Sequence, residues 1–338
     1  MTAGLLGSDR PLVEAYDCAL VDLDGVTYLG HEPIPWAADS LVAARRRGMR
    51  IVFVTNNASR PPTVVAEQLT GLGIPAGPED VMTASQSAAS LLASRLTPGD
   101  KVLVVGTDAL REAVREQGFV VVASADDEPV AVAQGYGPEV GWAQLAEAAY
   151  AIERGAWHVA SNLDTSLPQA RGFAPGNGAL VMAVQAATGV VPDSAGKPEP
   201  TMYRLAAERV GGVRPLVVGD RLDTDLAGAR AGGFAGLHVL TGVSSARDDV
   251  LADAAFRPTY LGADLRSLLE PHVAPQPAAE GWWSCREAAA RVWDGVLELD
   301  DRGADVMDVV RAACAAAWAA ADEGTPVDAA RVPDFPLG

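Results

Sequence analysis

Cysteine is scarce in this chain of 338 residues, where only Cys18, Cys285 and Cys314 occur. The three are widely spaced, odd in number and form no CxxC pair, so the sequence predicts neither a disulfide framework nor a zinc site. Unpaired cysteines are typical of a reducing compartment, and we expect a cytoplasmic protein. The N-terminus favours the same location, because no basic flank precedes its short apolar patch and it does not resemble a secretory signal.

Long apolar runs and positive charge are also lacking. The longest charge-free apolar stretch in the C-terminal part, residues 312–321, is far shorter than the roughly 20 residues that a membrane span needs. Lysine and arginine number 26 against 44 aspartates and glutamates, which gives a formal net charge of −18. This charge opposes binding to nucleic acid and to anionic membranes. It also repels phosphate, so a phosphate site would need local positive charge from a metal ion, a lysine or backbone N–H groups.

What the sequence does contain indicates an α/β protein with a parallel sheet. Hydrophobic residues make up 49% and charged residues 21%, the balance of a globular chain with a large core. Short runs rich in valine, isoleucine and leucine alternate with amphipathic segments such as 36–47 and 201–210. The predicted strands are 18–21, 51–54, 102–105, 130–133, 216–218 and 237–240. No GxxxxGK[ST] pattern occurs, which removes the common P-loop kinase interpretation.

The length exceeds that of a usual single domain, and the chain divides into three parts. We expect a Rossmann-like core domain in residues 10–83 and 190–270. Residues 84–189 carry their own strand and helix pattern and are predicted to be an inserted second domain. Residues 271–338 form a C-terminal extension that begins with the linker-like sequence PHVAPQPAAEGWW; the extension is acidic yet holds four of the seven tryptophans. Disordered acidic tails are poor in aromatic residues, so we expect this extension to fold or dock.

Several predicted strands stop abruptly at polar residues, in the strings VDLDG, VTNNAS and VVGDRLDTD. Ligands bind at the carboxyl ends of parallel strands, so Asp22, Thr55 and Asp220 are expected to be neighbours in space. Asp22 and Asp24 flank one residue after the first strand, with Gly25 next. One carboxylate can attack phosphorus while the other moves a proton. A simple DxDG turn or a calcium-like loop is the alternative.

Two further segments can handle phosphate. The hydroxyl of Thr55 and the backbone amides of Asn56 and Asn57 could grip phosphoryl oxygens, although an Asx turn or a helix N-cap explains the same residues. Lys197 precedes a helix that would start at Pro198, which would fix its ammonium near the strand ends. An ordinary surface lysine is the alternative.

Carboxylates near the fifth predicted strand can complete an oxygen shell for Mg²⁺. Asp220 follows the strand directly and Asp225 lies five residues further on. Together with Asp22 and the Asp24 carbonyl, they would leave positions for water and substrate phosphate. An acidic N-cap favoured by the helix dipole is the alternative for this segment.

The strings DLDGV, VTNNAS, GKPEP and GDRLDTD together resemble the four motifs of the haloacid dehalogenase-like phosphatases, over residues 15–270. The strings SNLDTSLP, PGNGALVMAVQAATG and VGDRLDTDLAGA look like the NagD-like or p-nitrophenylphosphatase subfamily, whose large α/β cap is inserted between the second and third motifs. The resemblance implies a phospho-aspartate mechanism, Mg²⁺ as cofactor, and residues 84–189 as the substrate-specificity cap. The implied residues are the nucleophile Asp22, the acid/base Asp24, the phosphate ligands Thr55 and Lys197, the metal ligands Asp22, Asp24, Asp220 and Asp225, and the substrate contacts Asn56, Asn57, Asn162, Asp164 and Leu167.

The resemblance also bears on the substrate, which we expect to be a small phosphate ester. Relatives that act on pyridoxal phosphate carry a histidine where this chain has Leu167, which argues against that substrate. Overall similarity, including the acidic tryptophan-bearing tail, is most like actinobacterial enzymes of glycerol 3-phosphate. Phosphoglycolate, nucleoside monophosphates and sugar phosphates are the alternatives. A phosphotransferase and a phosphate-sensing scaffold also stay open, as does the oligomeric state, homo-oligomers included.

Overall fold

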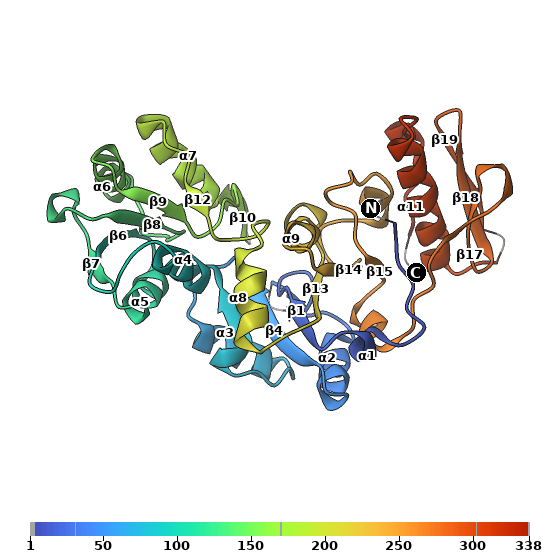
Figure 1. Ribbon diagram of the computed structural model, residues 1–338, viewed down its shortest axis with the longest axis horizontal. Helices are drawn as coiled ribbons and strands as arrows, with labels where there is room; N and C mark the ends of the chain where they lie inside the picture. Colours follow the sequence, from blue (N-terminus) through green and yellow to red (C-terminus); the bar gives the residue numbers. More distant parts are fainter. Residues whose placement is uncertain (1–3, 31, 170, 302, 337–338) are drawn as a thin grey trace. The chain divides into compact units, whose positions relative to one another are not determined.

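The computed structural model describes residues 4–30, 32–169, 171–301 and 303–336 (Figure 1). The chain divides into two compact units. The first unit comprises Met1–Phe53, Gly71–Pro75 and Ala206–Gly338, and the second comprises Val54–Thr70 and Ala76–Leu205. The boundaries predicted above at residues 84, 190 and 271 stay a prediction.

A six-stranded sheet with the order β15-β14-β13-β1-β4-β5 carries the first predicted motifs. Strand β1 pairs in parallel with both β13 and β4, and β13, β14 and β15 continue the parallel pairing. The central strands are almost fully buried, as their continuous apolar runs predict. The strands are β1 (Cys18–Val21), β4 (Arg50–Thr55), β5 (Val81–Thr83), β13 (Pro215–Gly219), β14 (Ala235–Val239) and β15 (Tyr260–Gly262).

Helices and short turns connect these strands. A small antiparallel hairpin, β2 (Tyr28–Leu29) with β3 (Glu32–Pro33), follows the first motif. The helical segments are α1 (Leu12–Ala15), α2 (Ala37–Arg46), α3 (Pro62–Gly71), η1 (Pro78–Asp80), α8 (Thr201–Arg209), the π-helical turn η3 (Leu222–Leu226), α9 (Ala227–Gly232), α10 (Ala246–Val250) and η4 (Leu265–Leu269).

A separate five-stranded parallel sheet lies in the second unit, with the order β12-β9-β8-β6-β7. Its strands are β6 (Lys101–Val105), β7 (Val120–Val122), β8 (Ala131–Gln134), β9 (Trp157–Ala160) and β12 (Asp193–Ser194). An antiparallel hairpin, β10 (Ser166–Gln169) with β11 (Gly172–Pro175), follows β9. The helical segments here are α4 (Ala84–Ala93), α5 (Asp108–Glu116), η2 (Ala125–Asp127), α6 (Trp142–Glu153) and α7 (Asn177–Thr188).

The C-terminal extension, residues 271–338, is folded over its described part, as its tryptophans predict. Its antiparallel sheet has the order β16-β17-β18-β19 and packs against the long helix α11 (Figure 1). Asp305 caps that helix, because its side chain accepts a hydrogen bond from the Met307 N–H. The elements are β16 (Gln276–Pro277), η5 (Ala279–Gly281), β17 (Trp283–Cys285), β18 (Ala288–Trp293), β19 (Val296–Asp300), α11 (Val306–Asp322) and η6 (Ala329–Arg331).

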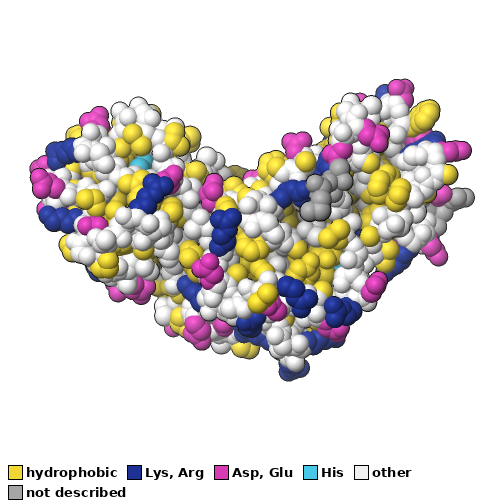
Figure 2. Space-filling view, in the orientation of Figure 1, with side chains coloured by type: hydrophobic (Ala, Val, Ile, Leu, Met, Phe, Trp, Pro, Cys, Tyr) yellow, Lys and Arg dark blue, Asp and Glu magenta, His cyan; other side chains and the backbone are white. Residues whose placement is uncertain are grey.

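The α/β fold class predicted from the sequence is confirmed. Each of the six predicted strands is present; β1 has the predicted bounds, and the ends of the other five lie within two residues of the prediction. Figure 2 shows basic and acidic side chains interspersed on the visible face. Within the described ranges, every helix is either too short or too polar to cross a lipid bilayer.

Candidate functional site

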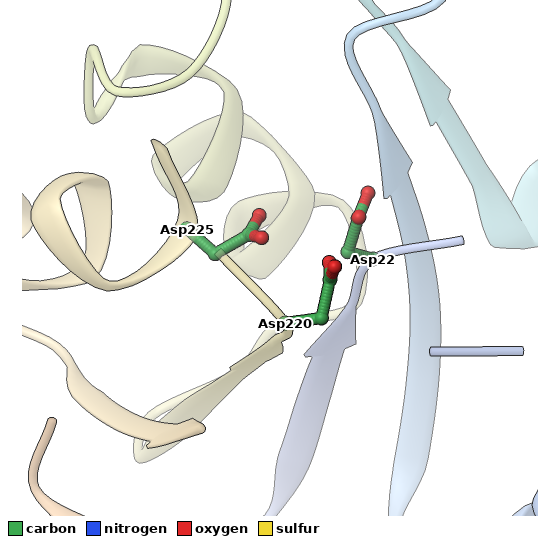
Figure 3. A group of neighbouring side chains, drawn as sticks. All are labelled: Asp22, Asp220 and Asp225. Carbon is green, nitrogen blue, oxygen red and sulfur yellow. The ribbon is translucent and has the colours of Figure 1, made fainter. Parts of the chain in front are cut away.

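Three buried carboxylates meet in the first unit: Asp22, Asp220 and Asp225 (Figure 3). One oxygen from each lies within 4.8 Å of the other two. Their residues are 9%, 0% and 0% exposed, respectively. Three carboxylates that are this close together and shielded from water need a positively charged partner, since an uncompensated buried charge is strongly unfavourable.

The sheet register explains how Asp22 and Asp220 meet. Val21 pairs with Val218 in neighbouring parallel strands, so Asp22 and Asp220 both follow strand ends at the same edge of the sheet. The Asp22 N–H donates to the Val218 carbonyl at 2.9 Å, which extends the pairing beyond the strand. The polar residues that stop these two apolar runs are therefore brought together by the parallel pairing itself.

Asp225 joins the group through the π-helical turn η3. Its side chain accepts a hydrogen bond from the Arg221 N–H at 3.2 Å, and its own N–H donates to the Arg221 carbonyl at 3.0 Å. Asp223, in the same turn, is directed elsewhere and forms an ion pair with Arg221 at 2.8 Å. The hydrogen bond from Arg221, helped by its charge, lowers the pKa of Asp223. Of these two aspartates, Asp225 therefore belongs to the buried carboxylate group and Asp223 does not.

Two glycines leave room for the Asp220 carboxylate. A Cβ on Gly25 would lie 2.4 Å from Asp220 Oδ2, and a Cβ on Gly242 would lie 2.0 Å from the same atom. Gly25 also has φ +87°, a conformation that side chains disfavour. Any larger residue at either position would displace the carboxylate.

The donor set of this group fits a hard divalent cation. Mg²⁺ prefers oxygen ligands, is held in proteins by a small number of carboxylates, and keeps its remaining positions for water and substrate phosphate. The exposed side chain of Asp24 is not part of the group; its Oδ1 lies 3.4 Å from the Gly30 N–H. The predicted contribution of Asp24 to the metal runs through its main-chain carbonyl and stays a prediction.

Further groups fix Asp220 in place. The Val243 N–H donates to Asp220 Oδ2 at 2.7 Å, and the Ser244 N–H donates to the Asp220 carbonyl at 3.0 Å. His238 Nε2 also lies 3.0 Å from that carbonyl, while its Nδ1 lies 2.8 Å from Asp249 Oδ2. Burial opposes a charged imidazole, but the charge and hydrogen bond of Asp249 outweigh it and raise the pKa of His238. Burial also raises the pKa of Asp249.

A second polar group, in the second unit, gathers the other predicted motifs around Asn56. Its Oδ1 accepts from the Lys197 N–H at 2.8 Å, and its Nδ2 donates to the Lys197 carbonyl at 3.2 Å and to Asp164 at 3.2 and 3.3 Å. Asn162 Nδ2 donates to the Asn56 carbonyl at 2.8 Å. Three predicted segments that are distant in sequence are therefore joined by one asparagine. Gly196 permits this approach, because a Cβ there would lie 2.9 Å from Asn56 Oδ1.

Thr55 is the last residue of β4 and is 8% exposed, and Lys197 is 4% exposed. The Thr55 hydroxyl accepts a hydrogen bond from the Asn57 N–H at 3.1 Å. Asn57 Oδ1 in turn accepts from both the N–H and the hydroxyl of Ser59, at 2.8 Å each. This is the Asx turn considered above, and it is compatible with a phosphate-binding backbone. The burial of Lys197 excludes the surface-lysine alternative.

The remaining predicted substrate residues lie on the loop after β9 and in the hairpin. Asn162 Oδ1 accepts from the Asp164 N–H at 3.2 Å, which forms a second Asx turn. Asn177 Nδ2 donates to the Asn162 carbonyl at 2.7 Å and so ties this loop to the start of α7. Leu167 is half-buried in β10. Contact of these residues with substrate stays a prediction.

Sequence reasoning missed the residues that support Asp220. Residues 241–245, TGVSS, lie after the end of β14, just as the recognised motifs lie at the ends of β1, β4 and β13. The rule that ligand-binding residues lie at the carboxyl ends of parallel strands could therefore have identified them. A histidine in an otherwise apolar strand was the signal for His238. Its partner Asp249 had no such signal, because nothing in the sequence places α10 beside β14.

Comparison with known proteins gives matches over most of the chain. A model of the haloacid dehalogenase-like hydrolases matches residues 19–120, and a related HAD-hydrolase-like model matches residues 194–268. A D-glycerol 3-phosphate phosphatase of Mycobacterium tuberculosis is 46% identical over 317 residues, which are 92% of this chain and 88% of the relative. An acid sugar phosphatase of Staphylococcus aureus is 35% identical over 259 residues, which are 76% of this chain and 98% of the relative.

A solved structure is similar over the same extent. The glycerol phosphate phosphatase of Mycobacterium tuberculosis in complex with magnesium superposes with a TM-score of 0.84 at 46% identity, covering 92% of each chain. The structure of that phosphatase in complex with calcium also gives a TM-score of 0.84. Both ions are hard divalent cations of the kind that the buried aspartate group fits.

Proposed function

This chain belongs to the haloacid dehalogenase-like hydrolases and is a phosphatase of that family, and we propose that it hydrolyses glycerol 3-phosphate to glycerol and phosphate with Mg²⁺ as cofactor. The buried group of Asp22, Asp220 and Asp225 carries the proposal, because it offers a nucleophile and a cation site at the ends of adjacent strands. The substrate is taken from the mycobacterial relative, whose similarity spans nearly the whole chain.

In the proposed mechanism, Asp22 attacks phosphorus and forms an aspartyl phosphate, while Asp24 gives a proton to the departing glycerol oxygen. Asp24 then takes a proton from water, which attacks the aspartyl phosphate and releases inorganic phosphate. Asp220 and Asp225 would hold Mg²⁺ with Asp22 and the Asp24 carbonyl. The ion, when bound, neutralises the clustered carboxylates and the negative charge of the phosphoryl oxygens.

The proposed phosphate ligands are Thr55 and Lys197, with Asn56 and Asn57 beside them. The ammonium of Lys197 supplies the local positive charge that an acidic protein needs at a phosphate site. Asn56 supports this role by binding both backbone groups of Lys197. We propose further that residues 84–189 form the substrate-specificity domain and that Asn162, Asp164 and Leu167 contact the organic part of the substrate.

Sugar phosphates are the second candidate substrates, because the staphylococcal relative is an acid sugar phosphatase. Phosphoglycolate and nucleoside monophosphates are further candidate substrates.

The cytoplasmic location also stays a proposal, supported by three free, buried cysteines. A homo-oligomer is compatible with all of these substrates.

Phosphate release from a panel of these esters, with Mg²⁺ or with EDTA, tests the proposal. We expect the highest kcat/KM for glycerol 3-phosphate, no turnover in EDTA and recovery when Mg²⁺ is restored. A higher kcat/KM for another ester would overturn the proposed substrate, and full activity in EDTA would overturn the proposed dependence on Mg²⁺. Transfer of phosphate to an added alcohol in place of release would identify a phosphotransferase.

Asp22→Asn tests the nucleophile, since the amide has nearly the same shape but cannot attack phosphorus. We expect turnover to disappear while the circular dichroism spectrum is unchanged. Asp223→Asn is the matched control, because Asp223 lies in the same acidic segment as Asp225 but is paired with Arg221 outside the group. Activity that survives Asp22→Asn would exclude the phospho-aspartate mechanism, and a scaffold protein would show no turnover even before substitution.

A further inference from the structure

The C-terminal extension shares a hydrophobic core with the catalytic sheet of the first unit. Helix α11 packs against β17, β18 and β19 of the extension and also against α10 and β15. The buried residues of this shared core come from both parts, and they include Ala246, Val250 and Leu261 from the catalytic part and Cys285, Ala290, Cys314 and Trp318 from the extension. The extension is therefore an integral layer of this unit.

Trp318 of α11 makes a polar contact with α10 inside this core. Its side chain is 2% exposed, and its indole N–H donates to the main-chain carbonyl of Asp249 at 2.8 Å. The guanidinium of Arg257 lies 5.3 Å from the Trp318 ring and pairs with Asp322, at the end of α11, at 2.8 and 2.9 Å. The hydrogen bond to Asp249 joins the C-terminal half of α11 to α10, and the contacts of Arg257 join it to the segment that follows α10.

Asp249 continues from this contact toward the buried carboxylates. Its carboxylate is fully buried and lies 2.8 Å from His238 Nδ1. The other ring nitrogen of His238 lies 3.0 Å from the Asp220 carbonyl and must be the donor there, because a carbonyl oxygen only accepts. Trp318, Asp249, His238 and Asp220 thus form a continuous series of hydrogen-bonded residues.

We propose that this series positions Asp220 for Mg²⁺, so that the C-terminal extension tunes the metal affinity of the catalytic core. His238 and Trp318 are positioning residues in this scheme. Some groups hydrogen-bond to a metal ligand without binding the metal themselves. Their loss typically lowers metal affinity or activity by roughly 10- to 100-fold. The inference rests on the proposed magnesium site.

The test is a titration of the metal-free, full chain with Mg²⁺ in the absence of substrate. Calorimetry measures the Mg²⁺ affinity. His238→Asn removes the donor to the Asp220 carbonyl, whereas His238→Gln keeps an N–H near the Nε2 position. We expect Mg²⁺ binding to weaken roughly tenfold or more in His238→Asn and to be partly rescued in His238→Gln. Trp318→Phe, which keeps an aromatic side chain but loses the indole N–H, should weaken binding by a smaller factor.

His272→Asn is the matched control. His272 is also buried, and its Nε2 donates to a main-chain carbonyl, that of Ser267, at 2.8 Å. This variant loses an equivalent hydrogen bond but should bind Mg²⁺ as the wild type does. The activity of His238→Asn should also return when Mg²⁺ is raised to saturation, because the chemical groups are unchanged.

The outcomes separate the inference from the proposed function. Unchanged Mg²⁺ affinity in His238→Asn, or equal weakening in His272→Asn, would overturn the positioning role and leave the phosphatase proposal intact. A wild-type protein that binds no Mg²⁺ would overturn the metal site itself. If His238→Asn does not fold, His238→Gln and Trp318→Phe carry the comparison, and wild-type affinity in both would overturn the inference.

Discussion

Asn56 binds Lys197 through both ends of its side-chain amide, with Oδ1 accepting from the Lys197 N–H at 2.8 Å and Nδ2 donating to the Lys197 carbonyl at 3.2 Å. One side chain thus binds the loop after β4 to the loop before α8, through the same pair of donor and acceptor bonds that a backbone segment would make. The same Nδ2 donates to Asp164, so three loops depend on one residue. This relationship makes Asn56 a structural support for the proposed phosphate ligand.

Asn56→Ala should lower both stability and activity. The lost hydrogen bonds leave the Lys197 backbone and Asp164 without this partner, which costs roughly 1 to 3 kcal/mol in the free energy of unfolding. Urea denaturation measures this cost, and kcat/KM should fall with it. Asn56→Asp should be worse, because a carboxylate would face Asp164 and the Lys197 carbonyl. Equal stability of all three proteins would contradict the supporting role.

Gly242→Ala should impair metal binding through a steric effect alone. The added Cβ would lie 2.0 Å from Asp220 Oδ2, so the carboxylate has to move. We expect Mg²⁺ affinity to fall roughly tenfold or more, measured by calorimetry on the metal-free protein. Gly71→Ala is the control, since a Cβ there meets nothing within 4 Å. Wild-type affinity in Gly242→Ala would show that Asp220 tolerates displacement.

His158 should make the protein less stable in acid. Burial lowers the pKa of His158 to about 4, against 6.5 for a free imidazole. Between these two pH values the unfolded chain binds a proton that the folded protein does not. The stability contributed by neutral His158 is therefore fully present above pH 6.5 and is lost as the pH falls toward 4, by at most ~1.4 kcal/mol per pH unit.

Urea unfolding of the wild type and of His158→Gln across this range measures the effect. The glutamine can still donate to Gln134, which lies 3.0 Å from His158 Nε2, but it does not titrate. We expect a shallower dependence of unfolding free energy on pH in the variant. Parallel curves for the two proteins would assign the acid sensitivity to other groups.

Asp24→Asn should distinguish substrates by their leaving groups. The proposed acid protonates the departing oxygen, a contribution of typically ~10² to 10⁴-fold in rate. Glycerol 3-phosphate releases a strongly basic alkoxide, whereas p-nitrophenyl phosphate releases a stabilised phenolate that needs less help. The variant should therefore lose far more kcat/KM with the alkyl ester, and this ratio excludes later hydrolysis of the phosphoenzyme. An equal loss with both esters would remove Asp24 from the role of general acid.

The α/β class and most of the acidic group could be predicted from the order of residues alone. Buried parallel strands read as apolar runs, and the residues that stop them must lie at one sheet edge, so Asp22 and Asp220 were predictable from local pattern and one topological rule. Asp225 followed from its spacing within the same motif. These predictions of position succeeded because each strand end can be recognised from a few consecutive residues, and the parallel-sheet rule then places the distant strand ends at one edge.

The side chains that support those residues could not be predicted in this way, because they depend on tertiary packing. Asp220 is held by Val243 and His238, and Asn56 joins Lys197 to Asp164, although these partners are separated by up to 141 residues. Such contacts arise from the packing of distant elements, which no short-range periodicity encodes. The place of Trp318 beside Asp249 has the same origin, because burial of the apolar face of α11 against α10 fixes that contact.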